Sequence, residues 1–149
     1  MIFDKSLLLS DDQAITADAP STNVIDLGVA GTPYGSSVAL TRDIGIGEGS
    51  EVPLHVSVTE TFNNLTSLQV QVQISPNNAD WTTIQGGKVV PAADLVAGYQ
   101  FAVPAEFPEG TDDQYVRLYY DIVGTAPTTG KITAGPVMAR QTNKTYGGA

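Results

Sequence analysis

Few residues of this chain combine a reactive type with a spacing that catalysis or metal binding requires. His55 is the single histidine, so no histidine pair can hold a metal ion, and a catalytic triad would need this residue as its base. It stands beside Leu54 and Val56 on the polar face of an alternating segment. We therefore predict a surface or interface histidine that takes no part in catalysis.

Adjacent acids occur twice, at Asp11-Asp12 and at Asp112-Asp113. Two carboxylates perform acid–base catalysis when they converge on one substrate, about 5 to 9 Å apart in glycosidases. Neighbours in an extended chain point to opposite sides, and both pairs lie in turn-like sequence. We expect both pairs of acids to lie in turns.

Two loops resemble ligand-binding motifs only in part. Residues 45–49, GIGEG, have the glycines of a phosphate loop but no following Lys-Ser/Thr, and Glu48 and Glu51 would repel phosphate. Residues 77–80, NNAD, carry oxygen ligands without the spacing of an EF-hand. We accordingly predict no catalytic, cofactor-binding or metal site, and a protein that is not an enzyme.

The elements that would position any site are strands. Strict alternation of apolar and polar residues marks three segments: 52–59 (VPLHVSVT), 68–75 (LQVQVQIS) and 115–123 (YVRLYYDIV). A period of two with one apolar face indicates a half-buried strand in an antiparallel sheet. Weaker strand candidates are residues 23–27, 37–41, 81–84, 99–103 and 131–138.

Turn clusters rich in Gly, Pro and Asn separate these segments, and only residues 91–98 could form one helical turn. About eight short strands predict an all-β, single-domain antiparallel sandwich or barrel. We assign the domain to residues 1–140 and a flexible tail to residues 141–149. The chain has no cysteine, so a disulfide framework is excluded.

The phase of the segment 115–123 places Tyr115, Arg117 and Tyr119 on its outer face. Tyrosine and arginine are enriched where proteins meet, so this row is a candidate protein interface. Two alternatives stay open. The row could be an ordinary amphipathic face, or the chain could be a carbohydrate-binding module that stacks sugars on Trp81, Tyr99 or Tyr119. Trp81 could equally be a core or sheet-edge aromatic.

The net charge of the chain narrows the classes of partner that it can bind. Sixteen acids face seven bases, a formal net charge of -9, which disfavours nucleic acid because phosphate binding needs clustered Lys and Arg. No stretch approaches the roughly 20 apolar residues of a membrane helix. The opening MIFDKSLLLSDDQ lacks the basic start and long apolar run of a signal peptide. We expect neither nucleic acid nor a membrane as partner.

Four segments resemble the capsid cement (decoration) proteins of short-tailed bacteriophages: MIFDKSLLLSD, STNVIDLG, LVAGYQF and GTDDQYVRLYYDIVGTAPTTGKITAGPV. The resemblance extends from residue 1 to about residue 139. It implies a jelly-roll sandwich on the exterior of the virion, made in the bacterial host cytoplasm. There it would bridge neighbouring capsomers of the major capsid protein and stabilise the expanded head.

Such proteins usually act as small symmetric oligomers. Since two-fold oligomers are commonest, we favour a homodimer, with a homotrimer as the alternative. The apolar residues Ile2 and Phe3 could dock on a neighbouring subunit and complete the candidate interface. A cement protein works by contact area, so this role agrees with the lack of a catalytic motif.

Overall fold

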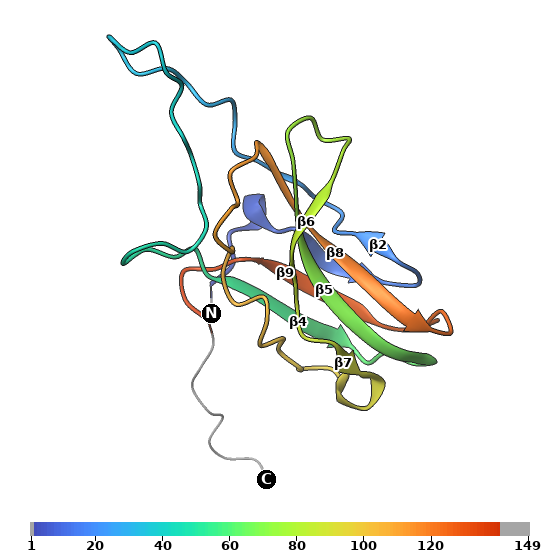
Figure 1. Cartoon of the computed structure of the whole chain (residues 1–149). Coiled ribbons are helices and arrows are strands. Elements are labelled where there is room, and N and C mark those ends of the chain that lie inside the picture. The colour runs from blue at the N-terminus through green and yellow to red at the C-terminus, as the bar shows by residue number, and fades with distance from the viewer. Residues whose placement is uncertain (1, 141–149) are drawn as a thin grey trace.

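Two antiparallel sheets form the molecule, a computed structural model that describes residues 2–140 (Figure 1). The small sheet has the order β1 (Ser10–Ala14), β9 (Lys131–Pro136), β4 (Leu54–Glu60). The large sheet has the order β2 (Ala19–Pro20), β8 (Tyr115–Gly124), β5 (Leu65–Ser75), β6 (Thr82–Gly86). In addition β3 (Ile25–Asp26) pairs with β8, and β7 (Val90–Pro91) pairs with β5. The short 3-10 helices are η1 (Lys5–Leu7) and η2 (Ala92–Asp94).

The connectivity is that of a jelly roll. Residues 98–107 extend the small sheet beyond β4 through the bridges Ser57 to Gln100 and Pro53 to Glu106. The pieces β2 and β3 lie along β8, and β6 and β7 lie along β5. If β2 and β3 count as one strand, β6 and β7 as another, and residues 98–107 as a further one, about eight strands result. Numbered along the chain, these eight strands have the order 1-8-3-6 in the small sheet and 2-7-4-5 in the large sheet. This double Greek-key order confirms the predicted jelly-roll sandwich.

The core lies between the inward faces of the two sheets. The predicted inward residues of the long strands are almost all buried: Leu54, Val56, Val58, Leu68, Val70, Val72, Ile74, Val116, Leu118 and Tyr120. Val52 and Ile122 are only half-buried. Burial of each such side chain contributes on the order of 1.5–3 kcal/mol, so these faces hold the sheets together.

One buried polar contact ties the small sheet to the large one. The hydroxyl of Tyr120 on β8 lies 2.6 Å from the Oγ of Ser10 on β1. Ser10 in turn donates to the Oε1 of Gln13 at 2.6 Å. Complete burial raises the pKa of the Tyr120 phenol far above its ordinary value, so this group is a neutral hydrogen-bonding link inside the core.

The turn after β4 is fastened to the loop that precedes β9. The side chain of Asn63 accepts from the backbone N–H groups of Thr128 and Thr129 and donates to the hydroxyl of Thr128. Beside it Gly130 has a φ of 135°, and a Cβ there would lie 2.3 Å from the Phe62 ring. Glycine is therefore required at this corner.

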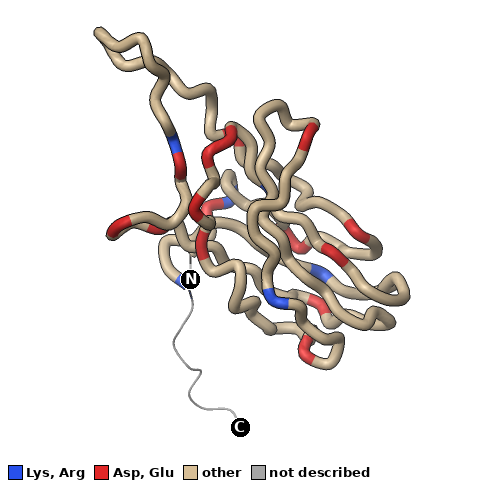
Figure 2. The backbone as a smooth tube through the Cα atoms, viewed as in Figure 1, with Lys and Arg blue, Asp and Glu red and all other residues tan. Residues whose placement is uncertain are grey.

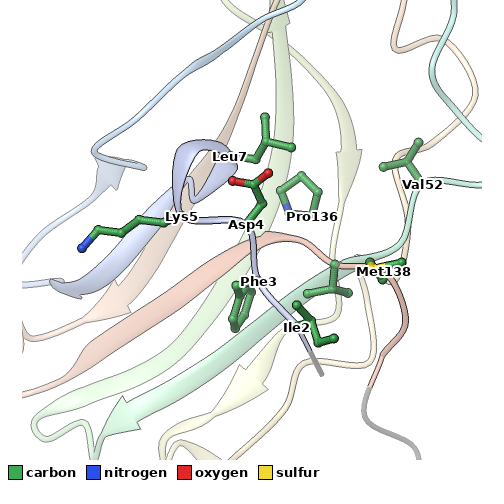
Figure 3. A pocket seen from close by; sticks show the side chains of 9 residues that line it. Ile2, Phe3, Asp4, Lys5, Leu7, Val52, Pro136 and Met138 are labelled. Carbon is green, nitrogen blue, oxygen red and sulfur yellow. The ribbon is translucent and has the colours of Figure 1, made fainter.

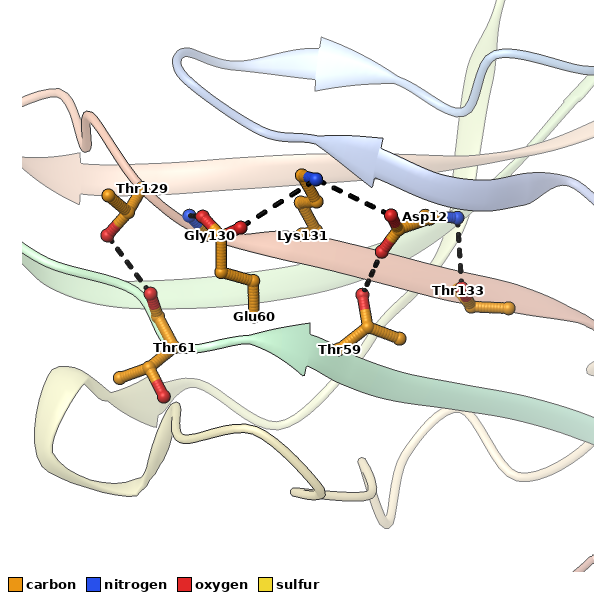
Figure 4. Close-up of polar contacts among 8 residues, drawn as sticks. All are labelled: Asp12, Thr59, Glu60, Thr61, Thr129, Gly130, Lys131 and Thr133. Carbon is orange, nitrogen blue, oxygen red and sulfur yellow. Dashed lines mark hydrogen bonds and ion pairs between the residues drawn. The ribbon is translucent and has the colours of Figure 1, made fainter.

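A small polar network covers the outer face of the small sheet (Figure 4). The Nζ of Lys131 lies 3.5 Å from Asp12 and 3.7 Å from Glu60. Asp12 also accepts from the hydroxyl of Thr59 at 2.6 Å, and its backbone N–H donates to Thr133 at 2.9 Å. The Thr59 hydrogen bond, with help from Lys131, lowers the pKa of Asp12.

The turn predicted around Asp11-Asp12 is wrong, because both residues lie in β1. The strand is hard to recognise because its register to β9 shifts between Ser10 and Gln13, and Asp12 has a φ of 48°. Such a bulge interrupts the alternation that marks a strand. The network around Asp12 gives this acid a structural role.

The weaker strand predictions had mixed outcomes. Short strands lie within residues 23–27 and 131–138, and β6 begins within residues 81–84. Residues 99–103 instead make a single isolated bridge, from Gln100 to Ser57. The strand predicted at residues 37–41 is wrong. These residues belong to a loop between β3 and β4 that projects from the sandwich (Figure 1). The predicted tail, 141–149, lies outside the described residues.

Candidate functional site

The predicted row lies on the outer face of the large sheet, in its central strand β8. Tyr115, Arg117 and Tyr119 are half-buried, while the residues between them, Val116 and Leu118, are fully buried. The row thus has the phase that the alternation predicts. Because β8 is flanked by β5 on one side and by β2 and β3 on the other, the sheet holds the row rigidly.

Arg117 is the organising residue of this row. Its Nε donates to the Oε1 of Gln73 on the neighbouring strand β5 at 2.8 Å. Its guanidinium carbon lies 4.0 Å from the centroid of the Trp81 ring and 5.9 Å from that of Tyr119. A guanidinium over an aromatic face is attracted by the ring quadrupole. Partial burial lowers the pKa of Arg117.

A row of glutamines continues the face on β5, and the sequence-based site did not include it. Gln71 and Gln73 lie opposite Tyr119 and Arg117. The side-chain amide of Gln71 donates to the Oε1 of Gln69 at 3.1 Å, and that of Gln73 donates to the hydroxyl of Thr83 at 3.1 Å. The alternating glutamines of the segment LQVQVQIS were the available signal. Together the two rows form an ordered polar and aromatic surface.

Trp81, which precedes β6, is half-buried at the edge of this surface. The sheet-edge alternative for this residue is therefore the one that the structure supports. The contact with Arg117 occupies one face of its ring. Of the other two proposed stacking residues, Tyr119 lies beside the same guanidinium, with its ring centroid 5.9 Å from the guanidinium carbon. Tyr99 instead packs edge-on against Phe101, with centroids 5.3 Å apart.

The two terminal segments form a second candidate surface. Phe3 bridges to Val137, which places the first residues beside the end of β9. Around them lies a mostly apolar hollow of about 630 Å³, here called the terminal hollow (Figure 3). Its lining is Ile2, Phe3, Asp4, Lys5, Leu7, Val52, Pro136, Val137 and Met138. Ile2 is largely exposed at its edge, whereas Phe3 is half-buried.

Comparison with known families supplies independent information about the whole domain. A family model described as Bbp16 matches residues 9–140. The chain belongs to the Bbp16 family. No curated protein matches the chain. The family name Bbp16 suggests a phage-related protein. This agrees in general terms with the resemblance to phage proteins.

In this Bbp16-family chain the prediction of a surface or interface position for His55 is wrong. The imidazole is fully buried, although it points outward from the small sheet, because Phe3 covers it. Both ring nitrogens lack a hydrogen-bond partner among the described residues. Burial, followed by the positive charge of Arg140, lowers the pKa of His55.

The described part of the Bbp16-family chain shows neither a metal-binding cluster nor a membrane-spanning helix. Within residues 2–140 no group of three or more His, Asp or Glu side chains could hold a metal ion. Asn77 uses its side-chain oxygen to accept from the N–H groups of Ala79 and Asp80, so it serves as a turn cap. Among the helices of these residues, none is long and apolar enough to cross a membrane.

Proposed function

We propose that this Bbp16-family chain is a structural virion protein that decorates the outside of a bacteriophage capsid. In this role it cements neighbouring capsomers of the major capsid protein and stabilises the expanded head. It performs no catalysis and needs no cofactor. It is made in the host cytoplasm and ends on the exterior of the virion, as a homodimer rather than a homotrimer.

The observation that carries this proposal is the organised face on β8 and β5. Arg117 is held by Gln73 and by the Trp81 ring at once, so its position is fixed before any partner arrives. A group that is already ordered loses less conformational entropy when it binds. Tyrosine, tryptophan and arginine are the residue types that dominate the energy of protein contacts. An ordered surface of this kind suits a large protein partner.

A cementing dimer also needs a contact between its two copies, and the terminal hollow offers an apolar surface for it. Stable contacts bury on the order of 1,200–2,000 Å² in total. A dimer that grips two capsomers forms its second contact at a high effective concentration. Because such a dimer binds only the shell that presents both sites, it stabilises that shell by mass action.

The carbohydrate-binding alternative is less favoured. A sugar stacks on an open aromatic face, but Arg117 already lies over the Trp81 ring. Tyr99 is engaged with Phe101. No described pocket combines these aromatics with the polar groups that would orient a sugar ring.

The proposal is tested by mixing purified protein with heads that lack it. We expect ordered density on the exterior of the heads and a higher temperature of head disruption. Arg117→Glu should weaken decoration at least tenfold, whereas the matched charge reversal of exposed Lys88, Lys88→Glu, should leave it nearly unchanged. Wild-type protein that leaves the heads bare would refute the role. Equal binding by both variants would remove Arg117 from the interface.

A further inference from the structure

The loop between β3 and β4 contains a segment unlike the rest of the chain. Residues 29–41, VAGTPYGSSVALT, are all exposed and include no charged residue. We call this segment the arm. It projects from the sandwich in Figure 1, and Figure 2 shows its tip without acidic or basic residues while acids are spread over the other loops. An uncharged projection is unusual for a chain with a net charge of -9.

The base of the arm is fastened to the domain. Arg42 donates to the carbonyl oxygens of Leu27 and Gly28, which joins the two limbs. The N–H of Ile44 donates to the carbonyl of Thr111 at 3.1 Å. Within the arm the N–H of Leu40 donates to the carbonyl of Gly31 at 2.8 Å. The arm therefore leaves the domain from a fixed point and closes on itself.

Apolar side chains of the arm face solvent. The exposed fractions are 83% for Val29, 107% for Tyr34, 70% for Val38 and 55% for Leu40. Since more than half of each of these side chains is exposed, the arm does not occupy a site on its own copy. Contact surfaces between proteins are depleted of charge at their centre and enriched in tyrosine. The arm has both properties.

The terminal hollow has the complementary character. It is open, and its lining includes Ile2 and Met138, which are 66% and 83% exposed. The only charged residues of the lining are Asp4 and Lys5, whose charges are opposite. Asp4 and Lys5 form no ion pair with each other among the described residues. The Asp4 carboxylate instead accepts hydrogen bonds from the N–H and the hydroxyl of Ser6, so an uncharged apolar segment could fill the hollow while this carboxylate keeps its partners.

We propose that the arm of one copy docks in the terminal hollow of a second copy, and that two copies exchange arms reciprocally. Two copies of a strongly acidic chain repel one another, and an uncharged arm in a nearly neutral hollow makes a contact that avoids this repulsion. The 13 residues of the arm and the 9 that line the hollow give 22 per subunit. A stable interface uses roughly 20–30 residues a side.

This pairing specifies how the homo-oligomer of the proposed function forms. It rests on the proposed function only for the location of the dimer on the capsid. The first test replaces residues 32–39 by Gly-Gly, since Gly31 and Leu40 are already hydrogen-bonded, and measures mass by light scattering without any heads. We expect a dimer for the wild type, and a monomer for the excised variant and for Val38→Asp. Val123→Asp, which alters an exposed valine elsewhere, should remain dimeric.

The second test does not depend on the folding of the excised variant or of Val38→Asp. The chain has no cysteine, so introduced cysteines can pair only with one another. A chain that carries both Val38→Cys and Met138→Cys should form an intermolecular disulfide between the arm of one copy and the hollow of the other. Neither single variant should form this disulfide by itself. A mixture of the two single variants should give the cross-linked heterodimer. A monomeric wild type, or a dimer that survives arm excision, would overturn the pairing. An arm-excised protein that keeps its dimer but no longer decorates heads would show that the arm meets the shell instead.

Discussion

The ring of Phe3 meets the imidazole of His55 edge to face, with centroids 5.7 Å apart and an angle of 62° between the planes. This contact explains how a histidine on the outward side of a strand becomes fully buried. It also makes the terminal segment part of the folded domain, since Phe3 bridges to Val137 in the same region. The histidine therefore reports on whether this segment is in place.

The first prediction is that Phe3→Ala exposes His55. The pKa of His55 should lie below its ordinary value of 6.5 in the wild type, because burial disfavours the charged form. In Phe3→Ala it should rise toward 6.5. The single histidine gives one imidazole signal, so an NMR titration measures both values directly. Ile2→Ala, which alters the exposed neighbour, should leave the titration unchanged, and an identical pKa in Phe3→Ala would contradict the covering role.

The second prediction concerns stability against pH. A histidine whose pKa is lowered in the folded state binds fewer protons there than in the unfolded state, so its contribution is complete above pH 6.5. It is lost as the pH falls from 6.5 through the lowered folded pKa. His55→Leu should reduce this loss while retaining the fold, because both ring nitrogens lack partners among the described residues. Urea unfolding at pH 7.5 and 5.0 would check it. A wild-type loss equal to that of the variant would count against it.

The third prediction compares two tyrosines that are neighbours on β8 but face opposite ways. Tyr120→Phe removes a hydroxyl that lies 2.6 Å from Ser10 in the core, so the free energy of unfolding should fall by about 1–2 kcal/mol. Tyr119→Phe alters the outer face, where water can replace the lost interaction, and should cost less than about 0.5 kcal/mol. Urea unfolding of both variants measures the difference, and equal losses would refute it.

The fourth prediction tests the corner at Gly130. Gly130→Ala adds a Cβ that would lie 2.3 Å from the Phe62 ring at a φ of 135°, so we expect a loss of about 2–4 kcal/mol. Gly98→Ala is the matched control. Its φ is 94°, yet no atom lies within 4 Å of the added Cβ, and the cost should be only about 1–2 kcal/mol. Similar urea midpoints for the two variants would show that Phe62 yields to the added atom.

The long strands could be predicted because each has one buried face. In residues 68–74 and 116–120 every second side chain points into the core, so the pattern follows directly from the pleat. The strand β1 could not be found this way, since the bulge at Asp12 breaks the period. The burial of His55 was missed for another reason. Alternation records which side of a sheet a residue occupies, but not that Phe3, 52 positions earlier, covers that side.

The candidate interface could be predicted only in part for a related reason. The phase of Tyr115, Arg117 and Tyr119 follows from their own strand, whereas Gln73 and Trp81 join them through strand pairing. Pairing between β5 and β8 depends on contacts 40 or more positions apart, which one local pattern does not encode. The arm was misread as a strand at residues 37–41 because its valine and leucine alternate with small residues, although no neighbouring strand pairs with it in the described structure.

The last prediction uses Trp81, the only tryptophan of the chain, to report on the organised face. Arg117→Ala removes the guanidinium that lies 4.0 Å from the indole centroid, so water reaches the ring and the emission maximum should move to longer wavelength. Arg117→Lys should shift it partly, because an ammonium cannot both reach Gln73 in the same planar geometry and cover the ring.

The cost to the free energy of unfolding should stay near the roughly 0.5–1 kcal/mol of cation–π contacts at exposed sites, because Arg117 and Trp81 are only half-buried. Lys88→Ala provides the control, since Lys88 is exposed and makes no described contact with the ring. A shift in Arg117→Ala with retained stability would establish that the residue organises a surface and does not maintain the fold. An unchanged spectrum would mean that the indole is covered without it, and the ordered face would then lose its central residue.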